Sequence, residues 1–436
     1  MTRFSGGIHP KEKKIAKLYR IQNIQYPQYV YLHLSQHTGK PAVPIVKEKD
    51  YVLRGQKVAQ SDGLISACIH SPVSGQVVGI KDVLHPVICK KLPAVVIESD
   101  GKFTTIELKP KYKEYHRFSP QELVGYIKEC GIVGLGGAMF PTDVKLSPPK
   151  DKVIDYVIAN GCECEPYLTS DDRLMQEYYD EIIEGLKIAM YILDALKGIV
   201  VVEDNKPDAI EKIKRKIERT PNVELRIVKT KYPQGAEKQL IQTVLNREVP
   251  SGGLPMDVGV VVQNVATLKA IYDAIFKGLP LIERVVTISG DIERLGNFVV
   301  PIGMMVKDVV KVLNINISDV NKIIFGGPMM GIAQESLEVP IIKGTSGILF
   351  LRTVSNKEYE YYQCVRCGKC VYVCPMKLMP NFLSIYIEHQ KWGKVEKYSP
   401  FDCIECGCCS YICIAKRPIV AQIKYAKTIL TTLVKK

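Results

Sequence analysis

The sequence contains no long hydrophobic run. No apolar stretch approaches the roughly 18 to 20 residues that cross a bilayer, and the first residues, MTRFSGGIHPKEKK, lack the apolar core of a signal peptide. We therefore expect a protein that stays in the cytoplasm and touches a membrane only peripherally.

The sequence also lacks a block of Lys and Arg interleaved with aromatic residues. The formal net charge is nevertheless +13, from 59 basic and 46 acidic residues. Without such a block, this charge favours attraction to an anionic membrane face, an acidic partner or dinucleotide phosphates over binding to nucleic acid. The seven histidines show no spacing typical of a metal site.

Length and composition indicate several soluble domains. A chain of 436 residues exceeds the size at which one hydrophobic core stops growing. Its 46% apolar and 24% charged residues are the mixture of an ordinary globular protein.

Fourteen cysteines are present, and in the cytosol they are expected to stay reduced. Eight of them form two repeats of the spacing C-x2-C-x2-C-x3-C, the first within CVRCGKCVYVCP and the second within CIECGCCSYICI. The other six are expected to be mostly small core residues; they are Cys68, Cys89, Cys130, Cys162, Cys164 and Cys408.

This spacing is typical of two [4Fe-4S] clusters, in which the fourth ligand of each cluster comes from the other motif. The predicted ligands of the first cluster are Cys364, Cys367, Cys370 and Cys413. Those of the second cluster are Cys403, Cys406, Cys409 and Cys374. Cys408 is then surplus. A zinc site is the alternative, but it leaves the third and fourth cysteine of each motif unexplained.

Upstream, the glycine-rich segment GLGGAMFPTDVK (134–145) is typical of a loop that binds a phosphate through backbone N–H groups. A capped helix is predicted just before it, at 119–131, which disfavours a Rossmann site. The alternative is a glycine-rich connector without a ligand. Three predicted strand ends favour a site, because α/β sheets bind ligands there. They carry Asn160, Glu163 and Glu165, then Gly235 and Glu237, then Asn264 and Thr267.

These segments together resemble the flavin- and NADH-binding subunit of respiratory complex I. The resemblance implies that FMN is held by Gly134, Gly136, Gly137, Lys145, Asn160, Asn264 and Thr267. It implies that Phe140, Glu163, Glu165 and Glu237 line the NAD(H) side. The sequence departs from that family at four positions, with Leu135 in place of arginine, Met139 and Asp143 in place of glycines, and Cys162 in place of aspartate.

From FSGGIHP to the second cysteine motif, the chain resembles the RnfC family, whose members belong to the Rnf complex, a membrane-bound ion-pumping ferredoxin:NAD oxidoreductase. The resemblance implies a multidomain α/β protein. Its expected parts are an N-terminal arm (1–25), a barrel-sandwich, lipoyl-like β domain (26–100), an FMN- and NAD(H)-binding α/β domain (101–283), a β-grasp, SLBB-like domain (284–350) and a helical two-cluster ferredoxin domain (351–436). The second domain lacks an Asp-Lys-Ala lipoylation turn, so we expect it to be a docking element.

The function implied is electron transfer between the two clusters, FMN and NAD(H), because a flavin converts one-electron into hydride chemistry. The expected partners are the membrane subunits and a ferredoxin-like iron–sulfur protein of the same complex, on the cytoplasmic face of a bacterial or archaeal membrane. Two alternatives remain: a soluble flavin and iron–sulfur reductase, such as a corrin reductase, and a non-catalytic electron relay or scaffold whose flavin site has decayed. Leu135 and Cys162 favour the last of these.

Overall fold

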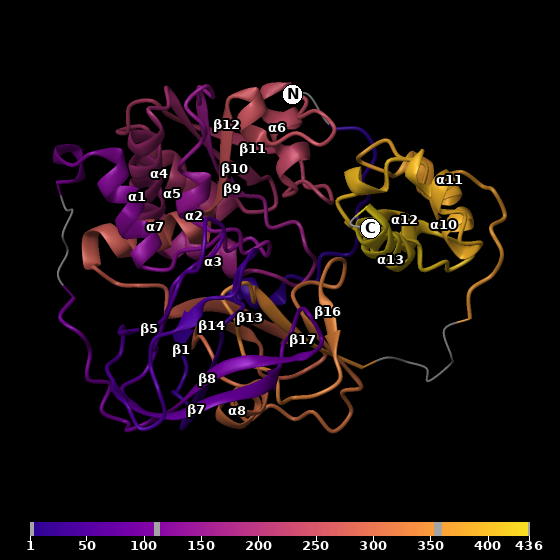
Figure 1. Cartoon of the computed structure of the whole chain (residues 1–436). Coiled ribbons are helices and arrows are strands. Elements are labelled where there is room, and N and C mark those ends of the chain that lie inside the picture. The colour runs from indigo at the N-terminus through magenta and orange to yellow at the C-terminus, as the bar shows by residue number, and fades with distance from the viewer. Residues whose placement is uncertain (1–3, 109–113, 353–359, 435–436) are drawn as a thin grey trace.

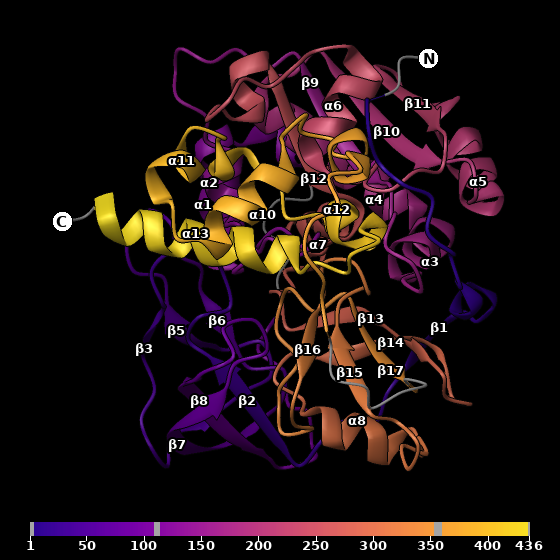
Figure 2. The ribbon, with the colours of Figure 1, turned by 90° about the vertical axis from the view of Figure 1, so that its right-hand side faces the viewer.

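The computed structural model describes residues 4–108, 114–352 and 360–434. The predicted arm, α/β domain and ferredoxin domain therefore each include a few residues outside the described ranges. A central α/β unit lies above two β-rich units, with a C-terminal helical unit at its side (Figure 1; Figure 2). Among the described residues, no helix combines the length and apolarity that crossing a membrane requires.

The first β-rich unit contains two small sheets, ordered β2-β8-β7-β4 and β3-β5-β6. Side chains alternate across the long strands, so that Val30, Leu32, Val95 and Ile97 all enter the core. The strands are β2 (Tyr29–His33), β3 (Val43–Pro44), β4 (Tyr51–Val52), β5 (Lys57–Gln60), β6 (Ile69–His70), β7 (Gly75–Leu84) and β8 (Lys91–Ser99). This is the predicted barrel-sandwich unit.

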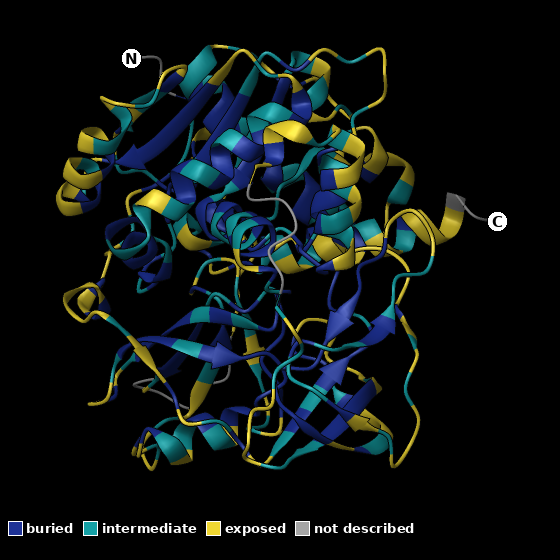
Figure 3. Cartoon of the chain, turned by 90° about the vertical axis from the view of Figure 1, so that its left-hand side faces the viewer, coloured by how far each residue is buried: buried dark blue, intermediate teal, exposed yellow. Residues whose placement is uncertain are grey.

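The α/β unit is a parallel sheet in the order β11-β10-β9-β12. Its strands are buried on both faces (Figure 3), since Val157 and Ala159 pack with α4 and α7 while Ile158 packs with α6. Its elements are α1 (Pro120–Glu129), α2 (Thr142–Lys145), β9 (Tyr156–Gly161), α3 (Ser170–Glu177), α4 (Tyr179–Leu193), β10 (Lys197–Glu203), α5 (Pro207–Ile217), β11 (Val223–Val228), α6 (Glu237–Leu245), η3 (Pro255–Val258), β12 (Val260–Asn264) and α7 (Val265–Lys277).

Local signals place α1 correctly. Ser119 and Glu122 form the expected capping box, and Gly131 follows the helix with a left-handed φ of +65°. The amphipathic pattern of the sequence predicts one long helix from about Asp171 to Lys197, and this prediction is wrong. Tyr178 leaves the helical conformation (φ −131°, ψ 31°) and separates α3 from α4, while Lys197 already belongs to β10.

The second β-rich unit combines one sheet with a single α-helix, as the thinning of helical patterns after residue 284 predicts. Its sheet is ordered β1-β14-β13-β17-β15-β16, and β1 (Ile21–Asn23) joins it in parallel from the N-terminal arm, after the short η1 (Ile15–Leu18). The other elements are β13 (Glu283–Gly290), β14 (Gly296–Pro301), α8 (Val306–Val312), β15 (Lys322–Phe325), β16 (Ile332–Gln334) and β17 (Gly347–Leu351).

The two cysteine motifs repeat each other in backbone conformation. Arg366 and Glu405 have φ values of 55° and 58°, and Gly368 and Gly407 have values of 72° and 81°. A short helix follows each glycine, so the motifs are true structural repeats. The elements of this unit are α9 (Lys369–Tyr372), α10 (Pro380–Glu388), α11 (Trp392–Glu396), η4 (Pro400–Asp402), α12 (Cys408–Ile412) and α13 (Ile419–Val434).

Candidate flavin and iron–sulfur sites

The glycine loop after α1 is closed by a hydrogen bond within its own backbone and is also held by side chains from α7 and β13. Gly134 N–H donates to the Phe140 carbonyl at 2.8 Å. The Thr267 hydroxyl, at the start of α7, accepts from Leu135 N–H at 2.9 Å. The Arg284 guanidinium, from β13, donates to the Leu135 carbonyl at 3.3 Å. The loop is therefore held in one position by side chains from two other elements.

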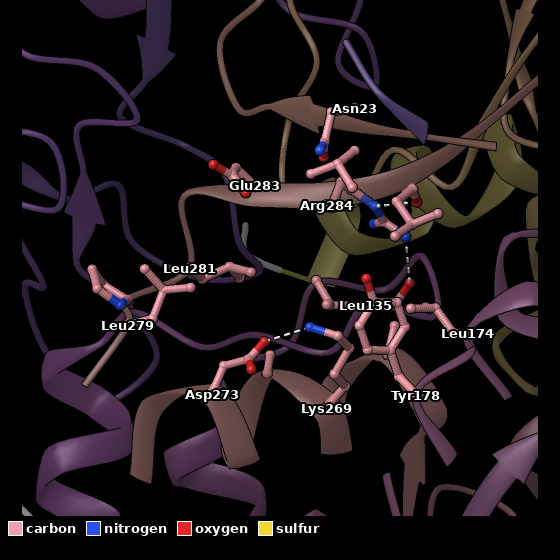
Figure 4. A pocket seen from close by; sticks show the side chains of 15 residues that line it. Asn23, Leu135, Leu174, Tyr178, Lys269, Asp273, Leu279, Leu281, Glu283 and Arg284 are labelled. Carbon is pink, nitrogen blue, oxygen red and sulfur yellow. Dashed lines mark hydrogen bonds and ion pairs between the residues drawn. The ribbon is translucent and has the colours of Figure 1, made fainter. Parts of the chain in front are cut away.

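A cavity of about 230 Å³ lies behind this loop (Figure 4). Leu135 and Arg284 line it on one side, and the ion pair of Lys269 with Asp273 (2.6 Å) stands on the other. Burial lowers the pKa of Arg284 to about 10. None of the predicted site residues lines this cavity, so its side of the loop supports the site without forming it.

The predicted cofactor residues converge on the other side of the loop. The cavity there measures about 330 Å³, at the lower end of the range for small-molecule sites. Nine of the eleven predicted residues line it; they are Gly134, Gly136, Phe140, Lys145, Asn160, Glu163, Glu165, Glu237 and Asn264. Gly137 and Thr267 are not among the lining residues, and Thr267 instead holds the loop through its hydroxyl.

Lys145 is the single basic residue among those that line this cavity, which also has four acidic residues. Its ammonium donates to Glu237 Oε1 at 2.6 Å and to the Val262 carbonyl at 2.7 Å. The first bond joins α2 to the start of α6, and the second joins α2 to β12. Lys145 is thus placed to meet an anionic group in the cavity.

Two asparagines fix the strand ends at the cavity. Asn264 caps α7 by accepting from Ala266 N–H at 2.8 Å, and its amide donates to Asp171 at 2.7 Å. Asn160 donates to the Gly235 carbonyl at 2.9 Å and accepts from Cys162 N–H at 3.0 Å. The α7 N-terminus, the glycine loop and Lys145 together form a donor set that fits a phosphate.

Glu163 and Glu165 are tied to backbone N–H groups as well as lining the cavity. Glu163 accepts from Asp171 N–H at 3.0 Å, at the start of α3, and Glu165 accepts from Met329 and Met330 N–H at 3.0 and 2.8 Å. Burial raises the pKa of each carboxyl to about 7. Sequence patterns indicated neither these bonds nor Asp171, which also lines the cavity.

Replacing Glu165 with glutamine is expected to flatten the pH dependence of stability. Since the unfolded pKa is 4.5 and the folded pKa about 7, the folded chain keeps this proton where the unfolded chain has lost it. The free energy of unfolding should therefore fall as pH rises from 4.5 to about 7, and E165Q should lose less of it. Thermal melts at both ends of this window measure the effect, with the exposed Glu293→Gln as control. Equal slopes for E165Q and wild type would contradict the assignment.

The cysteine motifs surround two separate cavities in the crossed arrangement. Cys374 of the first motif lies with three cysteines of the second motif, and Cys413 of the second lies with three of the first. The first of these sets, hereafter the inner set, is Cys374, Cys403, Cys406 and Cys409. The second, hereafter the outer set, is Cys364, Cys367, Cys370 and Cys413. Cys408 is fully buried and lines the inner cavity, with its thiol 4.0 Å from the Tyr232 carbonyl.

The thiols are spread around each cavity. Within residues 4–108, 114–352 and 360–434, no group of three or more His, Cys, Asp or Glu side chains is close enough to hold a single metal ion. A four-iron cubane needs thiolates spaced around a larger body. Each cavity presents the four cysteines that a [4Fe-4S] cluster requires.

The inner cavity adjoins the flavin-type cavity. Ile404 lines both, and the Tyr232 hydroxyl, which comes from the wall of the flavin-type cavity, donates to the Cys406 carbonyl at 2.7 Å. Gln239 of α6 donates to the Pro375 carbonyl at 3.4 Å. The outer cavity shares no lining residue with either of the other two. It is linked to the inner cavity by α9 and α12, because Cys370 and Cys374, and likewise Cys409 and Cys413, lie one helical turn apart and line different cavities.

Three family descriptions match successive parts of the chain. They are the RnfC barrel sandwich hybrid domain at 2–102, the Nuo51 FMN-binding domain at 127–273 and the 4Fe-4S dicluster domain at 356–414. These matches agree with the predicted fold class and with the predicted FMN and iron–sulfur cofactors.

Relatives match the chain over nearly its whole length. The C subunit of the proton-translocating ferredoxin:NAD(+) oxidoreductase complex of Clostridium ljungdahlii is 48% identical, over 98% of this chain and 93% of that protein. The C subunit of the Na(+)-translocating complex of Acetobacterium woodii is 43% identical, over 97% and 96%. Among solved structures, an NAD+-reducing [NiFe]-hydrogenase in the H2-reduced state aligns with a TM-score of 0.51 and 18% identity. The alignment covers 73% of this chain and 65% of that one, and indicates a shared fold alone.

Proposed function

Because the chain belongs to the RnfC family of ion-translocating ferredoxin:NAD(+) oxidoreductase complexes, we propose that it transfers electrons between two [4Fe-4S] clusters, FMN and NAD(H) within such a complex. The observation that carries this proposal is that the cavity lined by the glycine loop, Lys145 and Asn264 adjoins the inner cysteine cavity, which α9 and α12 link to the outer one. We also propose the domain boundaries 1–25, 26–100, 101–283, 284–350 and 351–436.

In the flavin cavity, bound FMN would supply the conversion between one-electron and hydride chemistry. Gly134, Gly136, Lys145, Asn160 and Asn264 would hold it, largely through its phosphate and ring edge. Phe140, Glu163, Glu165 and Glu237 line the side open to the nicotinamide nucleotide. Gly137, with a left-handed φ of +105°, belongs to the site through the loop backbone, and Thr267 belongs to it by supporting the loop.

The protein's own part in the electron path is to hold the inner cysteine set against the flavin cavity. Ile404 is the shared wall, and the bond from Tyr232 to the Cys406 carbonyl fixes the second motif to that wall. The outer set then lies toward the surface, where Cys367 is exposed. Electrons would enter or leave the chain there.

We assign the surface around the outer set to the iron–sulfur partner protein. Val365 and Ile414 line the outer cavity and are 62% and 57% exposed. Exposed Arg366, Lys369 and Lys416 surround them. An apolar centre with a basic rim suits a small electron carrier whose docking face is acidic. We propose the membrane subunits of the same complex as further partners and the cytoplasmic side of the membrane as the location, and the family assignment supports both.

Reconstitution tests the proposal directly. The chain is loaded with FMN, iron and sulfide, NADH is added without oxygen, and the visible spectrum is followed. Bleaching of the flavin bands and then of the broad iron–sulfur absorption is the expected result. A flavin that binds but stays oxidised in excess NADH would overturn the NAD(H) assignment, and a chain that binds no FMN would support the scaffold alternative.

A further inference from the structure

The N-terminal arm runs between the α/β unit and the C-terminal helical unit (Figure 1; Figure 2). Gly7 N–H donates to the Val373 carbonyl at 2.8 Å, next to Cys374 of the inner set. Ile8 and Tyr232 exchange two backbone hydrogen bonds of 2.9 Å each. Two successive residues of the arm thus bind the two units that carry the inner and flavin cavities.

Gly6 brings the arm into direct contact with the first cysteine motif. Its φ of +72° favours glycine, and a Cβ there would lie 2.7 Å from the backbone carbon and oxygen of Cys374. Real Cβ atoms do not approach backbone so closely, so any side chain would push the Cys374 loop away. The glycine is required by both its backbone conformation and the space around it.

The residues on either side secure this contact. Phe4 is 2% exposed, and the Lys231 ammonium lies 4.3 Å from its ring centre and donates to its carbonyl at 3.0 Å. Ile8 packs with Tyr232 and Val373 in a small buried cluster that also contains Cys406 and Cys408. The arm is therefore part of the packed interface between the two units.

The other end of the arm is anchored at the flavin cavity by Lys14. This buried ammonium donates to three backbone carbonyls, those of Glu163, Glu165 and Leu168, at 2.7, 3.0 and 2.7 Å. Three acceptors satisfy all three ammonium hydrogens, which is what a buried charge requires. The acidic segment that lines the flavin cavity is thereby tied to the same arm that touches Cys374.

We propose that residues 4–14 form a clamp that holds the inner cysteine set at a fixed distance from the flavin cavity, with Gly6 and Lys14 as its positioning residues. This inference rests on the proposed function. Two packed units of one chain move relative to each other unless their interface is extensive, and electron transfer slows steeply with distance. The clamp therefore sets the rate of transfer between the two sites. A change at Gly6, whose nearest neighbours are Val373 and Cys374, should leave the reaction of flavin with NADH unchanged.

Gly6→Ala tests the clamp, with Gly101→Ala as matched control. Gly101 has nearly the same φ, +70°, but a Cβ there meets nothing within 4 Å. Both variants carry the same backbone strain, and Gly6→Ala alone forces the Cys374 loop outward. In rapid mixing with NADH, flavin bleaching should keep its wild-type rate in both variants. Reduction of the clusters should slow at least about tenfold in G6A alone.

Hydrogen–deuterium exchange gives a readout independent of turnover, and Lys14→Met gives a second variant at a residue that lines neither of the two cluster cavities. Peptides covering 364–378 should exchange faster in G6A and K14M than in wild type, G101A or the control Lys17→Met at an exposed position. The clamp is wrong if wild type passes electrons from NADH to the clusters and both G6A and K14M equal it in two measurements. These are the rate of cluster reduction and the deuterium exchange of residues 364–378. If wild-type flavin is not reduced by NADH, the proposed function fails instead, and faster exchange would still establish the clamp. If G6A does not fold or loses iron, K14M against K17M decides by the same criteria.

Discussion

Cys374→Ala is expected to abolish the cluster held by the second motif and to spare the cluster held by the first. Cys374 belongs to the first motif by sequence, but lies in the cavity of Cys403, Cys406 and Cys409. Loss of one thiolate from a four-cysteine set commonly removes the cubane, so iron should fall from about eight to about four atoms per chain. The spectrum of the remaining cluster should match that of the outer set.

Paired variants separate the crossed from the uncrossed arrangement. C374A combined with Cys403→Ala should retain one cluster, because both residues serve the inner cavity. C374A combined with Cys364→Ala should retain none. If each motif instead supplied all four ligands of one cluster, the first pair should retain no cluster and the second pair should retain one. Iron and sulfide analysis with low-temperature spectroscopy of the reduced protein distinguishes them. Cys408→Ala, which keeps both sets of four, is the control and should retain about eight irons.

Loss of the inner cluster should also divide the reaction into two halves. In C374A, NADH should still bleach the flavin, because Ile404 is the single cysteine-motif residue among the described residues that line the flavin cavity. The outer cluster should then be reduced only slowly, since its cavity shares no lining residue with the flavin cavity. Rapid reduction of the outer cluster in this variant would contradict the order of the three cavities.

Sequence patterns predict those parts of this molecule whose chemistry is local. The cysteine spacing fixes the thiols of each motif because a cubane restricts their separation along the chain. Ser119 and Glu122 mark the start of α1 because their side chains bond to backbone groups within the same turn. Asn160 and Asn264 come together because the ends of parallel strands meet at one edge of a sheet.

Features created by tertiary contacts leave no such trace. Tyr178 is an ordinary helix residue by composition, yet it interrupts the helix where Lys269 lies over its ring at 4.7 Å. Lys14 is one of several lysines in a basic arm, and only the folded chain buries it among three carbonyls. The bond from Tyr232 to the Cys406 carbonyl joins residues 174 positions apart. Packing decides each of these.

The residues that depart from the complex I pattern leave the backbone of the glycine loop largely unchanged. Met139, where that family has glycine, still adopts a left-handed φ of 53°. Leu135, where it has arginine, lines both the flavin cavity and the cavity behind the loop, and the loop is held through its backbone groups. The backbone of the site is thus kept while the number of positive charges in it is reduced. Attraction of the FMN phosphate by a positive side chain should therefore depend mainly on Lys145.

Lys145→Met should therefore weaken FMN binding strongly. Lys145 is the one basic side chain lining the cavity, beside Glu163, Glu165, Asp171 and Glu237. Its removal would delete the proposed charge-assisted bond to the phosphate, and it leaves Glu237 without its partner at 2.6 Å. A hydrogen bond to a charged group contributes about 1.5–3 kcal/mol, which corresponds to a roughly 10- to 150-fold rise in the dissociation constant. Quenching of flavin fluorescence, titrated into the protein stripped of FMN, measures it.

A second substitution separates lost attraction from added repulsion. In K145M the unpaired Glu237 carboxylate would repel the phosphate, so the double variant with Glu237→Gln should recover part of the affinity for FMN. Glu237→Gln alone releases Lys145 from its ion pair, and this single variant should bind FMN as tightly as wild type or more tightly. A double-mutant cycle on the dissociation constants gives the coupling between the two side chains. Riboflavin, which has the same ring without the phosphate, should bind K145M and wild type alike if Lys145 acts on the phosphate. A similar loss for riboflavin would move Lys145 to the ring edge of the site.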